Sequence, residues 1–256
     1  MADSAEMNDR DTRAERVHHA YAGNRLLLAM PEDARAALKS AMSLTALARG
    51  TVLFDVGEDV RTTYLPCRPT MVSLLVLTPE GREVEAATVG WEGALGGVVS
   101  GGLKPAYGRA VVQAPGPAFT IQTARLDEMR QRFPALGDLF TRYADTMIAQ
   151  MMQSVACNAL HTIEQRCCRW LLAAHDRAGE DIVRLTQEAL ADMMGVQRTT
   201  VTAAAKILQA DGIIQTRRGR VEIRDRRKLE RRACECHAQV EAHFHKLLPE
   251  LALDAG

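Results

Sequence analysis

One group of side chains in the C-terminal third of this 256-residue sequence has the types and spacing that DNA reading requires. Arg198, Thr199, Thr202 and Lys206 project from one face if their segment is a helix. A guanidinium can donate two parallel hydrogen bonds to a guanine edge, and hydroxyl groups can reach a base or a phosphate. We therefore predict that this face, including Thr200, contacts double-stranded DNA, with Arg198 reading a base.

A second group consists of thiols and imidazoles, which are ligands for zinc. The segment Cys234-Glu235-Cys236-His237 has two thiols and a histidine, but its spacing is not that of a zinc finger. We therefore predict no metal site and a surface helix that packs on the DNA-reading part. A metal-responsive or thiol-redox-responsive regulator that uses Cys234, Cys236 and His237 is the alternative. The other cysteines of the helical region are read as small buried hydrophobic residues: Cys157, Cys167 and Cys168.

The elements around Arg198 have the order of a winged helix-turn-helix. A helix is expected over 166–177, and a second helix follows Thr186, a good N-cap, and stops at Gly195. After a three-residue turn, a third helix is expected over 198–210, with Val201, Ala204, Ala205, Ile207 and Leu208 on its inner face. Two short strands, 213–216 and 220–223, then form a basic hairpin, the wing. The expected phosphate contacts are Thr186, Gln187, Arg217, Arg218 and Arg220.

A long helix is expected upstream of this unit, after Phe133-Pro134. Apolar and small residues recur there at spacings of three and four, which is typical of either a buried core face or a coiled-coil seam. Its position between a β-rich part and a helical part favours a seam between two chains. The predicted seam residues are Leu136, Phe140, Tyr143, Met147, Met151, Ser154 and Asn158.

The N-terminal half has the pattern of an antiparallel jelly roll. A polar tail and a short helix after Pro31 precede it. Strands are expected over 51–55, 72–78, 83–89, 107–113 and 119–123, because apolar runs alternate there with Gly- and Pro-rich turns.

Composition limits the class of protein. The chain has 32 basic and 32 acidic residues, yet residues 196–232 hold eleven basic residues against four acidic ones. We expect no membrane span and no secretory signal, and therefore a cytoplasmic protein. Residues 51–123 contain no histidine for a cupin-type metal site, and no nucleophile elbow or phosphate-binding loop occurs, so we predict that it is not an enzyme.

The stretch from His161 to Arg224 resembles the DNA-binding domain of the Crp/Fnr superfamily of bacterial transcription regulators. The resemblance implies an α+β fold with an N-terminal β-roll of cyclic-nucleotide-binding type, a dimerisation helix and a C-terminal winged helix-turn-helix. The domain boundaries are expected at 1–24 (tail), 25–133 (β-roll), 134–161 (dimer helix), 162–230 (winged unit) and 231–256 (C-terminal helix). It also implies a homodimer on a pseudo-palindromic operator, and RNA polymerase as a partner if the protein is an activator. Thr199 and Ala203 replace the Glu and the second Arg of the cAMP receptor protein, so a different operator is expected.

The expected sensor pocket departs from that of cAMP-binding relatives. There, a carboxylate holds the ribose hydroxyl and an Arg grips the phosphate. In this sequence Ala94 takes the place of the carboxylate and Gly108 that of the Arg, with Arg109 shifted by one position to the other strand face. We therefore expect no cofactor and no ordinary cAMP binding. If another small effector binds, the candidate contacts are Glu92, Gly93 and Arg109, and a small-ligand-binding β-roll protein with no DNA role is a further alternative.

Overall fold

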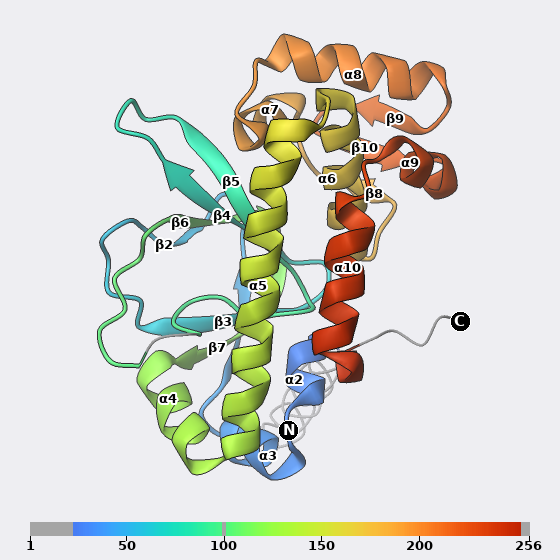
Figure 1. Cartoon of the computed structure of the whole chain (residues 1–256). Helices are drawn as coiled ribbons and strands as arrows, with labels where there is room; N and C mark the ends of the chain where they lie inside the picture. Colours follow the sequence, from blue (N-terminus) through green and yellow to red (C-terminus); the bar gives the residue numbers. More distant parts are fainter. Residues whose placement is uncertain (1–22, 99–100, 252–256) are drawn as a thin grey trace, which may run out of the picture.

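The computed structural model describes residues 23–98 and 101–251, which form a β-rich part, a long central helix and a C-terminal helical part (Figure 1). Residues 1–22 of the predicted tail lie outside the described residues. Asn24, which we had placed in that tail, is instead fully buried. Its amide nitrogen donates to the carbonyl oxygens of Pro66 (2.7 Å) and Gly93 (2.9 Å), and its Oδ1 caps α2 (Arg25–Ala29) by accepting from the Leu27 amide.

The N-terminal part is a roll of two antiparallel sheets, as predicted. One sheet has the order β1 (Ser43–Leu47), β7 (Gly116–Gln122), β3 (Thr62–Pro66), and the other β2 (Val52–Phe54), β6 (Arg109–Ala114), β4 (Met71–Leu77), β5 (Glu83–Val89). Buried residues of both sheets form one core cluster. The sequence analysis missed β1 and β3, because β1 exposes most of its residues without alternation and β3 ends in Pro66.

Helices close the roll on the side of the chain's N-terminus. α3 (Glu32–Lys39) begins directly after Pro31, as expected, and carries Glu32 and Asp33 in its first turn. α4 (Thr123–Arg132) follows β7 without a loop. Leucines of α2, α3 and α4 pack with Phe119 of β7 in one buried cluster, so these helices and the roll share a core.

The long helix α5 (Pro134–Leu160) runs past both parts of the chain (Figure 1). The predicted seam is mostly wrong, because Leu136, Phe140 and Tyr143 are at most 1% exposed and pack inside the chain's own core. Ser154 is buried and Met147 is half-buried, so only Met151 and Asn158 reach the surface. The three-four spacing therefore marks the face of α5 that packs on the roll and the C-terminal helix.

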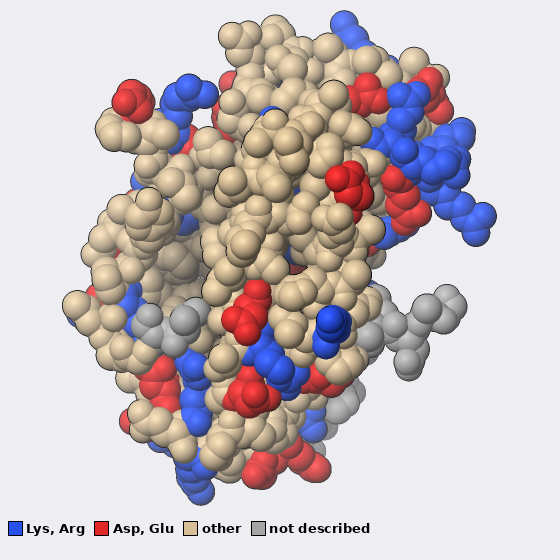
Figure 2. Space-filling view, in the orientation of Figure 1, with Lys and Arg blue, Asp and Glu red and all other residues tan. Residues whose placement is uncertain are grey.

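A different apolar face of α5 lies on the surface. Ile148, Met152 and Val155 are 49%, 68% and 71% exposed, and their spacings of four and three place them on one side of the helix. Ala159, also exposed, continues the same line. Figure 2 shows that few charged side chains cover the upper half of α5. This exposed face has the residue types of a helix–helix seam.

The C-terminal part has the predicted helices and wing. α6 (Ile163–Ala178) starts with a capping box formed by Thr162 and Gln165 and ends at Gly179 in the left-handed region. α7 (Gln187–Met194) and α8 (Arg198–Ala210) follow, and β9 (Ile214–Arg217) and β10 (Arg220–Ile223) form the wing. A third strand, β8 (Ile182–Val183), pairs with β10 and was not predicted.

The chain after the wing differs from the single C-terminal helix that we expected on the winged unit. It forms two helices, α9 (Arg226–Arg232) and α10 (Cys236–Leu247), and a short 3₁₀ turn, η1 (Pro249–Leu251). α10 lies beside α5 rather than on the winged unit alone (Figure 1). The reason is apolar burial, since Phe244, Leu248 and Leu251 join the core of the N-terminal part.

The β4–β5 hairpin packs directly on α6 and α7. Met193 of α7 lies against Ser73 of β4, and Gly195, which ends α7, faces Val84 of β5. Glu85 is half-buried in this contact, where its Oε1 accepts a hydrogen bond from Trp170 Nε1 at 2.8 Å and its other oxygen accepts from Ser73. The roll and the helix-turn-helix unit therefore share a buried, partly polar interface.

Burial raises the pKa of Glu85, and hydrogen bonds from Ser73, Thr88 and Trp170 oppose that shift. Since the pKa is higher in the folded than in the unfolded chain, the stability from this carboxyl is present below its unfolded pKa and is lost as pH rises through the folded pKa. Glu85→Gln keeps an acceptor for Trp170. We expect this variant to be more stable than wild type near about pH 8, and the difference in the free energy of unfolding between the two proteins to narrow toward about pH 5.

Glu85→Ala is the matched variant, because it leaves the Trp170 N–H without that acceptor. It should lower the free energy of unfolding by about 1–3 kcal/mol. Urea unfolding at several pH values measures both variants. A Glu85→Gln profile parallel to that of wild type would show that this carboxyl does not titrate in the interface.

Candidate nucleic-acid interface

The helix-turn-helix is built by local signals that the sequence carries. Thr186 caps α7 by accepting a hydrogen bond from the Ala189 amide at 3.1 Å. Gly195 ends α7 with φ of 66°, a conformation that strains any residue with a Cβ. The chain then turns through Val196 and Gln197 and enters α8 at Arg198.

α8 shows the predicted division into two faces, with two corrections. Val201, Ala204 and Leu208 are buried, as expected, but Ile207, which we had placed on the inner face, is 46% exposed. Arg198, Thr199, Thr200 and Lys206 are exposed on the outer side. Thr202 is half-buried, and its hydroxyl donates to Gln187 Oε1 at 2.8 Å. These two side chains therefore link α8 to α7 in the free protein.

A groove lies between the first turns of α7 and α8 and the wing. It is open to solvent, and Glu188 is an acid among its lining residues. Six of the predicted DNA contacts line it together: Thr186, Gln187, Arg198, Arg217, Arg218 and Arg220. Thr199, Thr200, Thr202 and Lys206 are outside this lining.

The basic residues of the wing region fall into two electrostatic classes. Arg224, Arg226 and Arg232 form ion pairs with acids of the chain, such as Glu222, and belong to its internal charge balance. Within residues 23–98 and 101–251, no ion pair involves the predicted contacts Arg198, Lys206, Arg217, Arg218 and Arg220. These five cations remain available to an external anion.

The predicted effector residues are not brought together. Glu92 Oε1 accepts from Arg177 Nε at 2.9 Å in a nearly buried ion pair. Arg109 lies elsewhere, on β6, where it donates to both oxygens of Asp55 and to Glu83. Each candidate contact is therefore already paired within the chain.

Gly93, the third effector candidate, is packed too closely to line a ligand site. A Cβ at this position would lie 2.1 Å from the Tyr143 hydroxyl. That hydroxyl donates to the Ala94 carbonyl oxygen at 2.9 Å, and Ala94 itself is buried. α5 thus fills the space beside Gly93 and Ala94.

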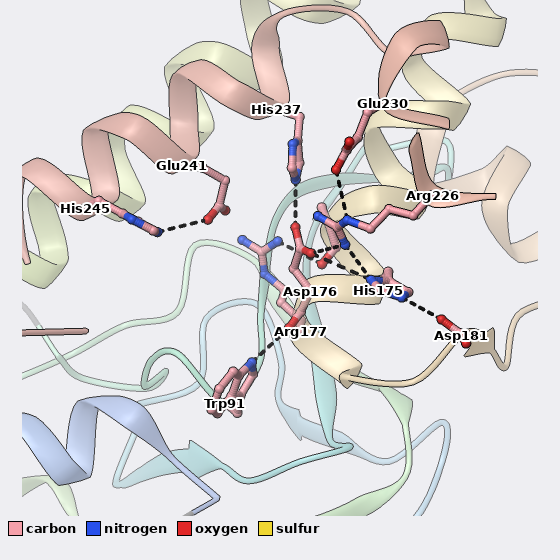
Figure 3. A network of polar contacts seen from close by, with 11 residues as sticks. Trp91, His175, Asp176, Arg177, Asp181, Arg226, Glu230, His237, Glu241 and His245 are labelled. Atoms are coloured by element: carbon pink, nitrogen blue, oxygen red, sulfur yellow. Dashed lines mark hydrogen bonds and ion pairs between the residues drawn. The ribbon is translucent and has the colours of Figure 1, made fainter. Parts of the chain in front are cut away.

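A polar network that the sequence analysis missed connects α6, α9, α10 and the loop after β5 (Figure 3). Asp176 accepts from His237 Nε2 at 2.8 Å and is paired with Arg226 and His175, while its backbone oxygen accepts from Trp91 Nε1 at 2.9 Å. Although burial raises the pKa of Asp176, hydrogen bonds from His175, His237 and Arg226 hold it well below its usual range. The carboxylate is charged and ties α9 and α10 to α6, and the Asp176 backbone oxygen ties α6 to the loop after β5.

The three weak metal-ligand candidates from the sequence, Cys234, Cys236 and His237, lie in two different places. His237 belongs to the network around Asp176 and does not face the thiols of its own segment. Cys234 and Cys236 instead lie close to Cys157 and His161 at the end of α5. Cys157 is buried as we expected, but it faces other thiols as well as apolar groups. The Cys157–His161 spacing of four residues on a helix was a signal that we had not used.

Residues 165–232 match the Crp-like helix-turn-helix domain. No curated protein matches the chain. Among solved structures, FixK2 of Bradyrhizobium japonicum aligns with a TM-score of 0.65 at 15% identity, over 75% of this chain and 98% of that one.

Two further structures agree with this fold. The c-di-GMP-responsive global regulator CLP of Xanthomonas campestris aligns with a TM-score of 0.60 at 17% identity, over 76% of this chain and all of that one. A CRP-family transcriptional regulator of Thermus thermophilus aligns with a TM-score of 0.60 at 23% identity, over 74% and 96% of the two chains. The chain therefore has a Crp-like helix-turn-helix domain within the fold of Crp/Fnr regulators, as the sequence resemblance predicted. These matches support a DNA-binding transcription regulator.

Proposed function

We propose that this protein is a homodimeric transcription regulator that binds a pseudo-palindromic operator and reads its bases with α8. The observation that carries the proposal is the groove where Arg198 of α8 and the arginines of the wing meet without ion-pair partners. A protein must present such unpaired cations to neutralise phosphates. Arg198 at the start of α8 has the position from which a reading helix contacts base edges in the major groove.

The contacts divide by role in this proposal. Arg198 reads a guanine edge, and the exposed Thr199, Thr200 and Lys206 contact nearby bases or phosphates. The wing arginines and the N-terminus of α7 hold the phosphate backbone. Thr202 and Gln187 join this surface only if their mutual hydrogen bond opens or if Gln187 donates through its amide nitrogen.

The exposed face of α5, formed by Ile148, Met152, Val155 and Ala159, is the proposed dimer seam. Two such faces would bury apolar side chains that are now in contact with solvent. A two-fold axis along α5 would set the two reading helices about one DNA turn apart, near 34 Å. RNA polymerase is the further partner if the protein activates transcription, and the compartment is the cytoplasm.

The roll does not bind cAMP in the usual way in this proposal. Ala94 is buried under Tyr143, and the nearby Glu92 is paired with Arg177, so neither supplies a free carboxylate for a ribose. Arg109 is held by Asp55 and Glu83 and cannot pair with a cyclic phosphate without losing them.

No described helix is long and apolar enough to cross a bilayer. The matched fold supports a regulator rather than an enzyme.

The first prediction from this proposal separates base reading from phosphate binding. At a site selected from random duplex DNA, Arg198→Ala should weaken binding by about 1–3 kcal/mol and relax specificity at one position. Arg218→Ala should weaken binding to cognate and random DNA alike. It should also reduce the slope of log affinity against log salt concentration by about one. Titrations at several fixed salt concentrations, each with and without cAMP, measure both effects, and cAMP should change neither.

Equal losses on cognate and random DNA for Arg198→Ala would overturn the base-reading role. A motif enriched only with cAMP would overturn our interpretation of the roll. Failure to enrich any motif in either condition would favour a small-ligand-binding protein without a DNA role.

The second prediction concerns the dimer. Val155→Glu puts a carboxylate into the proposed seam, where burying it unpaired should raise the dimer dissociation constant about 100-fold or more. Val56→Glu is the matched control, because Val56 is 50% exposed and follows β2, outside α5. Sedimentation of both variants measures the change. A Val155→Glu protein that stays dimeric as tightly as the control would exclude this face as the seam.

A further inference from the structure

Three thiols and an imidazole meet at the base of the winged unit. Cys157 and His161 lie at the end of α5, and Cys234 and Cys236 lie where α9 gives way to α10. One ligand atom from each of these residues lies within 4.8 Å of the others. All three thiols are buried and His161 is half-buried. Neither the apolar cores nor the proposed DNA groove uses this cluster.

We propose that Cys157, His161, Cys234 and Cys236 bind one Zn²⁺ ion in a tetrahedral site. With Zn–S near 2.3 Å and Zn–N near 2.0 Å, a tetrahedron has edges of about 3.8 Å between two sulfurs and about 3.5 Å between sulfur and nitrogen. The Sγ atoms of Cys157 and Cys234 are 3.6 Å apart, and Cys236 Sγ is 3.5 Å from His161 Nδ1. Two opposite edges of the cluster thus already have the lengths that the metal requires.

The groups around the cluster complete the second layer of a zinc site. With Nδ1 facing the thiols, His161 keeps Nε2 free, and this nitrogen lies 3.3 Å from Glu235 Oε1. A carboxylate on the second nitrogen fixes the tautomer and the ring orientation of a zinc-bound histidine. Gln153 Nε2 donates to Cys236 Sγ at 3.0 Å, a hydrogen bond that stabilises a thiolate.

The charge of the residues around the cluster also fits a bound Zn²⁺ ion. Zn²⁺ with three thiolates and a neutral imidazole carries one net negative charge, and each thiol that binds releases its proton to solvent. Arg169 attracts a negative charge on Cys157, and Arg166 attracts one on Cys157 and on Cys234. The Nε atoms of both arginines are buried without a hydrogen-bond partner among the described residues. A loaded site would balance these buried cations.

The position of the cluster gives the metal a structural role. Its ligands flank the Crp-like domain, since Cys157 and His161 precede residues 165–232 and Cys234 and Cys236 follow them. One ion would therefore close the chain at both ends of that domain and hold the domain to the end of α5. Closing a loop of this length removes conformational freedom from the unfolded chain and stabilises the folded one.

Metal analysis of the full chain, purified under reductant without chelator, tests the site directly. We expect one zinc per wild-type chain and substoichiometric zinc in Cys236→Ala and His161→Ala. Cys67→Ala is the matched control, because Cys67 is equally buried but lies in the core of the roll, and it should keep its zinc. Glu235→Ala removes only the second-layer carboxylate and should weaken zinc affinity by about tenfold or more.

A second measurement does not depend on whether a variant folds. Metal-free wild-type protein titrated with Co²⁺ should develop, at one equivalent, the intense visible absorption of a tetrahedral thiolate site, and Zn²⁺ should abolish it. Absence of that absorption, absence of zinc in wild type, or equal zinc in Cys236→Ala and wild type would each overturn the proposal. A Cys157–Cys234 disulfide that persists under reductant would do the same. These readouts need no DNA, so their failure is distinguishable from failure of the proposed function.

Discussion

The contact between Tyr143 and the loop after β5 sets the rotation of α5 against the roll. The Tyr143 ring is buried, its hydroxyl donates to the Ala94 carbonyl oxygen, and Gly93 leaves no room for a Cβ beside it. A helix held in this rotation must turn Ile148, Met152 and Val155 outward, because they lie on another side of the helix from Tyr143. The same contact fills the place beside Ala94, where cAMP-binding relatives have a carboxylate, and it decides which face of α5 is left on the surface.

The distribution of ion pairs explains how a chain with no net charge can present a basic groove. Most charges of the C-terminal part cancel internally, as Arg226 does with Asp176 and Arg232 does with Glu164. Paired charges of this kind add little to the long-range field. Among the described residues, Arg198 and Lys206 of α8 and Arg217, Arg218 and Arg220 of the wing have no ion pair, so local pairing and not the total charge shapes the positive surface there.

The parts that sequence analysis predicted well are those encoded by neighbouring residues. Local signals determine the ends of α6 and α7, namely the N-caps Thr162 and Thr186 and the left-handed Gly179 and Gly195. The helices and the wing of the winged unit were therefore predicted almost to the residue. The predicted seam was placed on a face that is buried within the chain, because α5 has two apolar faces and only tertiary packing decides which one the roll covers. β1 was missed because most of its residues are exposed without alternation, and β3 because it ends in Pro66.

The thiol cluster was missed for a different reason, since its ligands are more than seventy residues apart in the sequence and meet only because α10 folds back along α5. Periodicity and spacing describe one element at a time, so they found Cys234 and Cys236 but assigned them the wrong neighbour, His237. In the fold, Asp176 holds His237, which leaves the two thiols facing Cys157.

The winged unit is held to the rest of the chain on two sides of different character. On one side, the ends of the unit are fastened to α5 and α10 by the proposed metal ligands and by the Asp176 network. On the other, α7 packs on the β4–β5 hairpin around Glu85, where Met71 and Leu75 of β4 join Trp170 and Met193 in one buried apolar cluster. In the proposed dimer, a change in the separation of the two reading helices requires each winged unit to move against α5. A signal that acts on the roll would then reach α8 through β4 and β5, because these strands pack on α6 and α7 and share their apolar core.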